Sequence, residues 1–220
     1  MKFIDFEVNT GAENMRIDAE LLDKAIQEKC QEPIFRLYGW KPACVSLGRN
    51  QKDDFLDKNS LSLLGIDVVR RLTGGRALLH DNEITYSFIC PFEYLKNGES
   101  VIESYKEISQ ILINAFGLAG INLEFGGKST INTKFDYCML ISTGADLCYN
   151  GKKLIGSAQV RKHSYLLQHG SILFDYDKNL LENIFKEKVS TDEITCIKEI
   201  VPNYKISDVL NLLQNVKNFL

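Results

Sequence analysis

The sequence lacks the features that would place it in a membrane-bound or repetitive class. No uninterrupted apolar run approaches the roughly 18 residues that a membrane-spanning helix needs. Residues 1–7 alternate in polarity and carry acids, which is typical of a strand and not of a signal peptide. Internal repeats and low-complexity segments are also missing. We therefore expect a globular protein that stays in the cytoplasm and binds no membrane.

Cysteine occurs six times, but never as a Cys-x-x-Cys pair. In a cytosolic chain, scattered cysteines are reduced thiols more often than a disulfide framework. A zinc site built from Cys138, Cys148, His163 and His169 fits no structural zinc spacing. We therefore expect no metal, and we expect most of these thiols to be small buried hydrophobic groups.

A strong excess of one charge is missing as well. The net charge of −3 at pH 7 argues against a general nucleic-acid binder. The charge is unevenly spread, because residues 128–163 hold six lysines and arginines against two aspartates. Such a segment indicates an anionic substrate, an acidic partner or simply a solvated charge run. The six cations are Lys128, Lys134, Lys152, Lys153, Arg161 and Lys162.

Hydrophobic periodicity and turn residues predict an irregular alternation of strands and helices. We expect helices at 11–29, 54–64, 99–116, 178–185, 191–199 and 205–220, and strands at 1–7, 33–38, 43–47, 66–69, 84–89, 121–125 and 165–174. The pair Asn150-Gly151 predicts a hairpin between strands 146–149 and 153–158. These elements favour an α/β protein of the α+β type, with a mixed, largely antiparallel sheet and flanking helices. Residues 1–190 would form the main domain, with 191–220 as a helical extension packed on it.

Two adjacent glycines mark residues 69–81 as a loop between strands 66–69 and 84–89. Glycines let the backbone bend tightly and approach a ligand, and guanidinium groups grip carbonyl, carboxylate or phosphate groups. The loop has neither the Gly-Lys-Ser/Thr of a Walker loop nor the Gly-x-Gly-x-x-Gly of dinucleotide folds. A plain connecting turn and a ligand-binding loop both stay open. The residues concerned are Gly74 and Gly75, flanked by Arg70, Arg71 and Arg76.

The stretch Arg-Arg-x-x-Gly-Gly-x-Ala-x-x-His-Asp at 70–81 resembles the signature loop of the biotin/lipoate protein ligase and octanoyltransferase family. Residues 3–15, 35–40 and 46–51 resemble the family's opening elements. Residues 150–159 look like its lysine motif, and residues 167–173 look like the strand that follows. Together these matches span roughly residues 1–185 in the family's order. The resemblance implies the catalytic-domain fold of that family.

Two reactions occur in this family, and Cys138 discriminates between them. Ligases activate a free acid with ATP, whereas octanoyltransferases take a ready-made acyl group, in one branch through a cysteine. Cys138 lies fifteen residues before Lys153, which resembles the spacing of that branch. A thiolate is the competent nucleophile, and a nearby Lys153 would favour it and polarise the thioester carbonyl. The apolar residues after Cys138 depart from the pattern, so its exposure and an inert buried thiol stay open. Cys148 alternates within a strand and is expected to pack.

Other residues of the two motifs are expected to bind the substrate. In the lysine motif, Gly156 and Ala158 would allow close approach, and Ser157 would donate a hydrogen bond to a developing oxyanion. His80 and His169 are expected to line the site without an assigned role. The full set of predicted binding residues is Arg70, Arg71, Gly74, Gly75, Arg76, His80, Gly156, Ser157, Ala158 and His169.

The resemblance implies an octanoyltransferase of lipoate biosynthesis that uses no cofactor. It would move octanoyl from acyl carrier protein through a thioester on Cys138 to a lysine of a lipoyl domain or of glycine cleavage H protein. An ATP- and Mg-dependent lipoate-protein ligase stays open, with Arg70, Arg71 and the Gly74-Gly75 backbone on the adenylate phosphate. So do an octanoyl amidotransferase between carrier proteins and a non-catalytic acyl or biotin binder.

Overall fold

The computed structural model describes the chain except for residues 128–136, 141–143, 145, 187, 189–191 and 220. Its helices, strands and short 3-10 helices (η) are, in chain order, β1 (Lys2–Asn9), α1 (Gly11–Gln27), β2 (Ile34–Trp40), β3 (Cys44–Leu47), α2 (Lys58–Leu64), β4 (Asp67–Arg70), β5 (Leu78–His80), β6 (Glu83–Pro91), η1 (Phe92–Tyr94), α3 (Val101–Gly117), β7 (Glu124–Phe125), η2 (Cys138–Leu140), β8 (Leu147–Tyr149), β9 (Lys152–Lys162), β10 (Tyr165–Leu173), α4 (Lys178–Phe185), α5 (Ile197–Ile200), α6 (Ile206–Leu213) and η3 (Gln214–Asn218).

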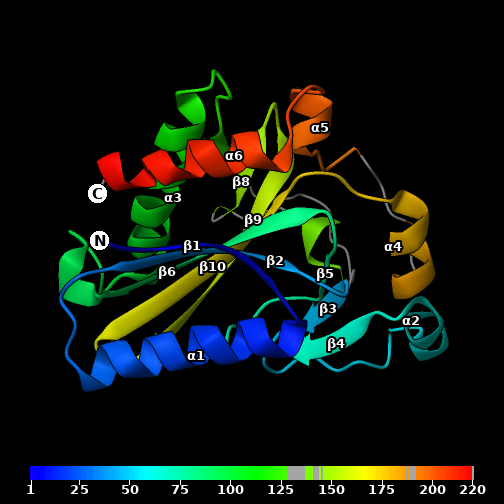
Figure 1. Cartoon of the computed structure of the whole chain (residues 1–220), viewed down its shortest axis with the longest axis horizontal. Coiled ribbons are helices and arrows are strands. Elements are labelled where there is room, and N and C mark those ends of the chain that lie inside the picture. Colours follow the sequence, from blue (N-terminus) through cyan, green and yellow to red (C-terminus); the bar gives the residue numbers. More distant parts are fainter. Residues whose placement is uncertain (128–136, 141–143, 145, 187, 189–191, 220) are drawn as a thin grey trace.

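Two sheets organise the described residues (Figure 1). The larger sheet runs β1-β2-β6-β10-β9-β8-β7, and only its β1–β2 pair is parallel. The smaller sheet runs β4-β3-β5, with β3 parallel to β4 and antiparallel to β5. The predicted mixed, largely antiparallel sheet with flanking helices is therefore confirmed.

The helices cover the larger sheet on both faces. Alternate residues of a strand point to opposite faces, so neighbouring side chains on β2 join different apolar clusters. Ile34 packs with Leu22 of α1, whereas Phe35 packs with Ile108 of α3 and Val209 of α6. The C-terminal elements α6 and η3 therefore share the core that α3 forms with the sheet. Within the described residues, no helix is long and apolar enough to cross a membrane.

The buried faces of the two long helices are not simply their apolar faces. On α1, the apolar residues Met15, Ala19, Leu22 and Ile26 recur at helical spacing, but the helix buries Asn14, Asp18, Leu22 and Ala25. Two polar residues lie inward because they meet buried polar groups of β2, which compensates their loss of water. On α3, the apolar Ile102 is exposed, and the helix buries Ser104, Ile108, Ile111 and Ala115 among others.

Some predicted elements are shorter or interrupted. The loop predicted between strands 66–69 and 84–89 contains the short strand β5. The strand expected at 121–125 shrinks to β7, and the helix expected at 191–199 to α5, which starts at Ile197. The Asn150-Gly151 hairpin is confirmed, and both residues have a positive φ, as the tight turn requires.

Candidate active site

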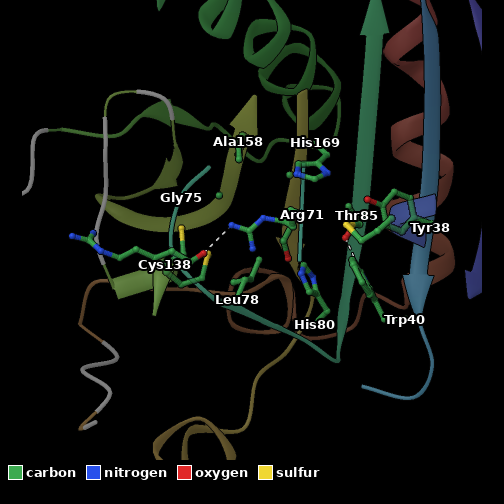
Figure 2. Close-up of a pocket in the computed structure, with 17 residues that line it drawn as sticks. Tyr38, Trp40, Arg71, Gly75, Leu78, His80, Thr85, Cys138, Ala158 and His169 are labelled. Carbon is green, nitrogen blue, oxygen red and sulfur yellow. Dashed lines mark hydrogen bonds between the residues drawn. The ribbon is translucent and has the colours of Figure 1, made fainter. Parts of the chain in front are cut away.

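A pocket lies between the two sheets, at the end of α1, and its wall is mostly apolar (Figure 2). β5, β6, β9, β10 and η2 all contribute to this wall, as does the loop before β5. Arg70, Gly74 and Lys153 were predicted for the site but do not belong to the wall. The other predicted residues do line it, namely Arg71, Gly75, Arg76, His80, Cys138, Gly156, Ser157, Ala158 and His169.

Cys138 stands at the first position of η2 and is half-buried in the pocket wall. Its N–H donates to the carbonyl oxygen of Ala77 at 2.8 Å, which ties η2 to the strand segment before β5. The apolar Met139 that follows is fully buried and also lines the pocket. The apolar residue after the cysteine therefore anchors the turn, while the thiol stays on the pocket wall.

Lys153 is buried, with 1% of its surface exposed, although it stands beside the Asn150-Gly151 turn. Its Nζ lies 3.1 Å from the Asp146 carboxylate, donates to the Cys138 carbonyl oxygen at 3.1 Å and lies 4.0 Å from the Cys138 Sγ. Burial lowers the pKa of Lys153, but the negative charges of Cys138 and Asp146 together raise it above the ordinary value. Lys153 therefore remains an ammonium group beside the sulfur.

Gly156 leaves the space that the Lys153 side chain occupies. A Cβ atom at Gly156 would lie 3.0 Å from both Lys153 Cε and Met139 Sδ. Gly156 was predicted to allow close approach of the substrate. Its missing side chain also makes room for the side chains of Lys153 and Met139. Cys148 is buried opposite Lys153 in the β8–β9 register and does not belong to the pocket wall.

A chain of hydrogen bonds orients the Ser157 hydroxyl. Gln168 Nε2 donates to the Tyr86 hydroxyl at 3.0 Å, and this hydroxyl lies 2.8 Å from Ser157 Oγ. Burial raises the pKa of Tyr86 to about 12, so its hydroxyl stays protonated and can donate to Ser157. In that arrangement Ser157 Oγ accepts from Tyr86, and its own proton is available to a group in the pocket.

The signature-loop arginines bind the protein's own backbone. Buried Arg71 donates from Nη1 to the Ser46 carbonyl oxygen at 2.7 Å, and from Nη2 to the Arg76 carbonyl oxygen at 2.9 Å. Arg70 Nη1 donates to the carbonyl oxygens of Gly48 and Gln51, each at 2.7 Å. Both guanidinium groups therefore shape the loop, and only Arg71 also reaches the pocket wall.

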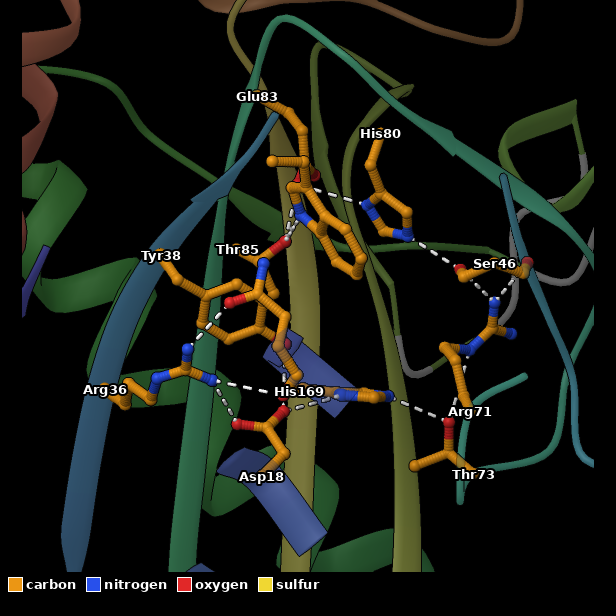
Figure 3. A network of polar contacts seen from close by, with 12 residues as sticks. Asp18, Arg36, Tyr38, Ser46, Arg71, Thr73, His80, Glu83, Thr85 and His169 are labelled. Atoms are coloured by element: carbon orange, nitrogen blue, oxygen red, sulfur yellow. Dashed lines mark hydrogen bonds and ion pairs between the residues drawn. The ribbon is translucent and has the colours of Figure 1, made fainter. Parts of the chain in front are cut away.

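One hydrogen-bonded relay runs from Arg71 through His169 to Asp18 (Figure 3). Thr73 Oγ1 accepts from Arg71 Nε at 3.4 Å and lies 2.8 Å from His169 Nε2. On the other side of the ring, His169 Nδ1 faces the Asp18 carboxylate at 3.4 Å. Burial raises the pKa of Asp18, but His169 and Arg36 outweigh it and lower the pKa overall. Arg36 lies 2.8 Å from the carboxylate.

A second relay runs from Arg71 through His80 to Glu83 (Figure 3). Ser46 Oγ accepts from Arg71 at 2.6 Å and donates to His80 Nε2, also at 2.6 Å, while His80 Nδ1 faces Glu83 at 3.1 Å. The His80 ring stacks on Trp40 with 3.8 Å between centroids, and burial lowers its pKa. His80 is thus a neutral hydrogen-bond relay in the pocket wall.

Sequence reasoning missed most members of these relays. All five missed residues are buried: Asp18 and Glu83 lie outside the matched stretches, and Arg36, Ser46 and Thr73 lie inside them without a predicted role. The one usable signal was on α1, where Asn14 and Asp18 stand four residues apart beside apolar positions. An acid on an inward helical face requires a buried partner, because an unpaired buried charge is strongly unfavourable.

Most of the described cations in the basic segment at 128–162 contact other groups of the protein. Lys128 and Lys134 lie outside the described residues, and Lys153 is buried against Asp146. Lys162 pairs with Asp23 at 2.7 Å, and the Arg161 guanidinium lies 4.0 Å above the Phe92 ring and donates to a backbone carbonyl. Only Lys152 is exposed without such a contact in the described part of this segment.

Comparison with known proteins agrees with this fold. Residues 10–216 match the family model described as the lipoyl protein ligase A/B catalytic domain. The chain is 41% identical over 182 residues to Octanoyltransferase LipM of Clostridioides difficile, covering 81% of this chain and 67% of that protein. It is also 41% identical over 189 residues to Octanoyltransferase LipM of Carboxydothermus hydrogenoformans, covering 85% and 70%.

Solved structures share the fold at lower identity. Protein Ta0514 of T. acidophilum, a putative lipoate protein ligase solved with bound lipoic acid, matches with a TM-score of 0.75 and 20% identity, covering 98% of this chain and 83% of that one. A lipoate-protein ligase A solved with ATP matches with a TM-score of 0.76, also at 20% identity, covering 98% and 83%. The chain belongs to the lipoyl protein ligase A/B catalytic domain family. The resemblance seen in the sequence is thus confirmed, and the protein is an enzyme of the acyltransferase class.

Proposed function

We propose that the protein is an octanoyltransferase that works through a thioester on Cys138. The donor is octanoyl-acyl carrier protein, and the acceptor is a lysine of a lipoyl domain or of glycine cleavage H protein. The observation that carries the proposal is the Lys153 ammonium 4.0 Å from the Cys138 Sγ at a mostly apolar pocket. Similarity to proteins named Octanoyltransferase LipM supports it. A catalytic thiol must stay reduced, which fits a reaction in the cytoplasm.

The first half-reaction moves octanoyl onto the enzyme. The Cys138 thiolate attacks the thioester carbonyl carbon of the donor, and the carbonyl oxygen becomes an oxyanion. The Ser157 hydroxyl, whose proton is free for a pocket group, donates to this oxygen. The intermediate collapses by breaking the bond to the donor sulfur, which leaves as a thiolate and takes a proton from solvent.

The second half-reaction moves octanoyl to the acceptor. The neutral amine of the acceptor lysine attacks the enzyme thioester, the C–S bond to Cys138 breaks, and the nitrogen loses a proton to solvent. Cys138 leaves as a thiolate beside the Lys153 ammonium, which stabilises it as a leaving group. Because the donor is already a thioester, these two half-reactions need neither ATP nor a metal ion.

Turnover with and without ATP tests the proposed function. The purified enzyme is incubated with octanoyl-acyl carrier protein and an unmodified lipoyl domain, and the domain is then analysed by intact mass. We expect ATP-independent addition of one octanoyl group. Strict dependence on ATP and free octanoate would contradict the proposal and indicate a ligase.

The choice of donor is tested in the same assay. Octanoylated H protein replaces octanoyl-acyl carrier protein, with the unmodified lipoyl domain as before. A much higher rate from the octanoylated H protein would identify an amidotransferase and contradict the proposed donor. Tight binding of octanoate without turnover of any donor would indicate a non-catalytic acyl binder.

A further inference from the structure

Two loops beside the pocket concentrate positive charge on an acidic protein. We call residues 48–52, which follow β3, and residues 70–76, which run from the end of β4 toward β5, the double loop. It holds five lysines and arginines and no acid, whereas the whole chain has a net charge of −3. The five are Arg49, Lys52, Arg70, Arg71 and Arg76.

The two halves of the double loop form one unit. The Arg49 N–H donates to the Thr73 carbonyl oxygen at 2.8 Å, and Arg70 Nη1 donates to the Gly48 carbonyl oxygen at 2.7 Å. A Cβ atom at Gly48 would lie 1.9 Å from the Gly75 carbonyl oxygen, so the backbones are in direct contact. The backbone segments that carry the cations of both halves are therefore held side by side.

Three of these cations have no acidic partner within the described part of the chain. Arg70 and Arg71 are occupied by backbone carbonyl groups, but Arg49 and Lys52 are exposed and Arg76 is half-buried. Among the described residues, no acid forms an ion pair with any of these three. Of the two acids that follow Lys52, Asp53 is paired with Lys58 at 2.9 Å and Asp54 is exposed.

The double loop also borders the reactive thiol. Gly75 and Arg76 line the same pocket wall as Cys138, and Figure 2 shows Gly75 on the Cys138 side of that pocket. A macromolecule that rests on the double loop therefore stands next to the pocket into which it must deliver an acyl chain.

From this arrangement we infer that the double loop is the docking surface for the acyl donor, an acidic carrier protein that presents its thioester on a phosphate-bearing arm. The inference rests on the proposed octanoyl transfer. A negative carrier is repelled by the negative chain as a whole, so a local positive surface is needed to orient and accelerate encounter.

The donor fits this surface better than the acceptor does. The donor's arm must bring the entire acyl chain into the pocket, and its phosphate then passes Arg76 in the pocket wall, a group suited to phosphate oxygens. The acceptor lysine only has to reach the thioester carbon on Cys138 and carries no anion on its side chain.

Charge reversal away from the pocket wall tests the docking surface. Lys52→Glu and the double variant Arg49→Glu/Lys52→Glu are compared with Lys217→Glu, an exposed lysine of η3 far from α2 and β4 (Figure 1). Formation of octanoyl-enzyme is measured with octanoyl-acyl carrier protein and with the small neutral donor octanoyl-N-acetylcysteamine.

In the double variant we expect kcat/KM for the carrier to fall about tenfold or more at low salt. The small donor should react at the wild-type rate, and Lys217→Glu should match wild type with both.

Salt gives a second readout. The wild-type rate with the carrier should fall as salt rises. The rate of the double variant should change much less, because the two positive charges that salt would screen have been replaced. An unchanged carrier rate in the double variant overturns the inference. An equal loss with both donors also overturns it, because the double loop would then shape the pocket and not the encounter.

The remaining outcomes separate the partners. If octanoyl-enzyme made from the small donor transfers slowly to the lipoyl domain in the double variant, while loading from the carrier is normal, the acceptor docks there and the donor assignment is wrong. A wild-type enzyme that takes octanoyl from neither donor contradicts the proposed function itself, and the docking assignment falls with it.

Discussion

At the scale of single residues, the site depends on a buried ion pair that the lysine motif does not reveal in the sequence. Lys153 belongs to the lysine motif, and its Nζ lies 3.1 Å from the Asp146 carboxylate. Both side chains are almost fully buried. Removing one partner of a buried pair leaves an uncompensated charge. Loss of activity in a lysine variant therefore does not by itself separate chemistry from folding.

Paired substitutions separate the two. We expect Lys153→Met to lower the free energy of unfolding by about 3–5 kcal/mol, because Asp146 stays buried without its partner. The double variant Lys153→Met/Asp146→Asn should recover most of this loss in urea unfolding and remain inactive in octanoyl transfer. Wild-type stability of the single variant would contradict the buried pair. Wild-type activity of the double variant would remove Lys153 from the chemistry.

At the scale of elements, α1 does more than cover the sheet. Through Asp18 it binds Arg36 and Tyr38 of β2 and reaches His169 of β10, so one carboxylate fastens the helix to two strands that border the pocket. The same helix carries Asp23, whose pair with Lys162 is about half-exposed. The two aspartates offer a direct comparison on one helix.

We expect Asp18→Ala to lower the free energy of unfolding by about 3–5 kcal/mol, because the buried Arg36 loses its counter-charge. Asp23→Ala should change it by no more than about 1 kcal/mol, as is usual for exposed pairs. Equilibrium urea unfolding of both variants measures the difference. Equal effects would mean that the Asp18 network does not fasten α1.

The sequence predicted those elements whose causes are local. The Asn150-Gly151 turn and the end of α2 at Leu64, which was predicted at the same residue, both depend on neighbouring residues. The buried face of α1 and the burial of Lys153 could not be predicted this way. Their partners lie on other segments, Arg36 on β2 and Asp146 across the hairpin, and these reverse the usual preference of polar groups for water.

The residues of the candidate site were also predicted only in part. The motifs pointed to Cys138, Ser157 and their neighbours, which the fold brings into one pocket wall. They did not reveal that Arg70 and Arg71 bind backbone carbonyl groups, because a guanidinium placed for a ligand and one placed for a loop look alike in sequence.

At the scale of the whole molecule, the two relays that meet at Arg71 connect both sheets and respond to pH. Burial lowers the pKa of His80 below its ordinary value of 6.5, so the folded protein resists protonation there. The unfolded chain takes up that proton as pH falls through about 6.5. The unfolded state then binds more protons than the folded state, and acidification destabilises the fold. The contribution of His80 is complete above pH 6.5 and declines below it.

We expect the free energy of unfolding to fall between pH 7 and pH 5.5, with His80 contributing a slope of at most about 1.4 kcal/mol per pH unit. The variant His80→Gln should show a shallower slope over this range, whatever its absolute stability. Urea unfolding at several pH values measures both slopes. Identical slopes would contradict the assignment of His80 as a buried neutral group.

The most direct measurement concerns the thioester itself. Octanoyl-acyl carrier protein is added without any acceptor, and the enzyme is analysed by intact mass and peptide mapping. The proposed function predicts one octanoyl group on Cys138, removable by neutral hydroxylamine as a thioester is, absent in Cys138→Ser and retained in Cys148→Ser. A label on Cys148, or a Cys138→Ser enzyme that turns over at the wild-type rate, would contradict the central claim.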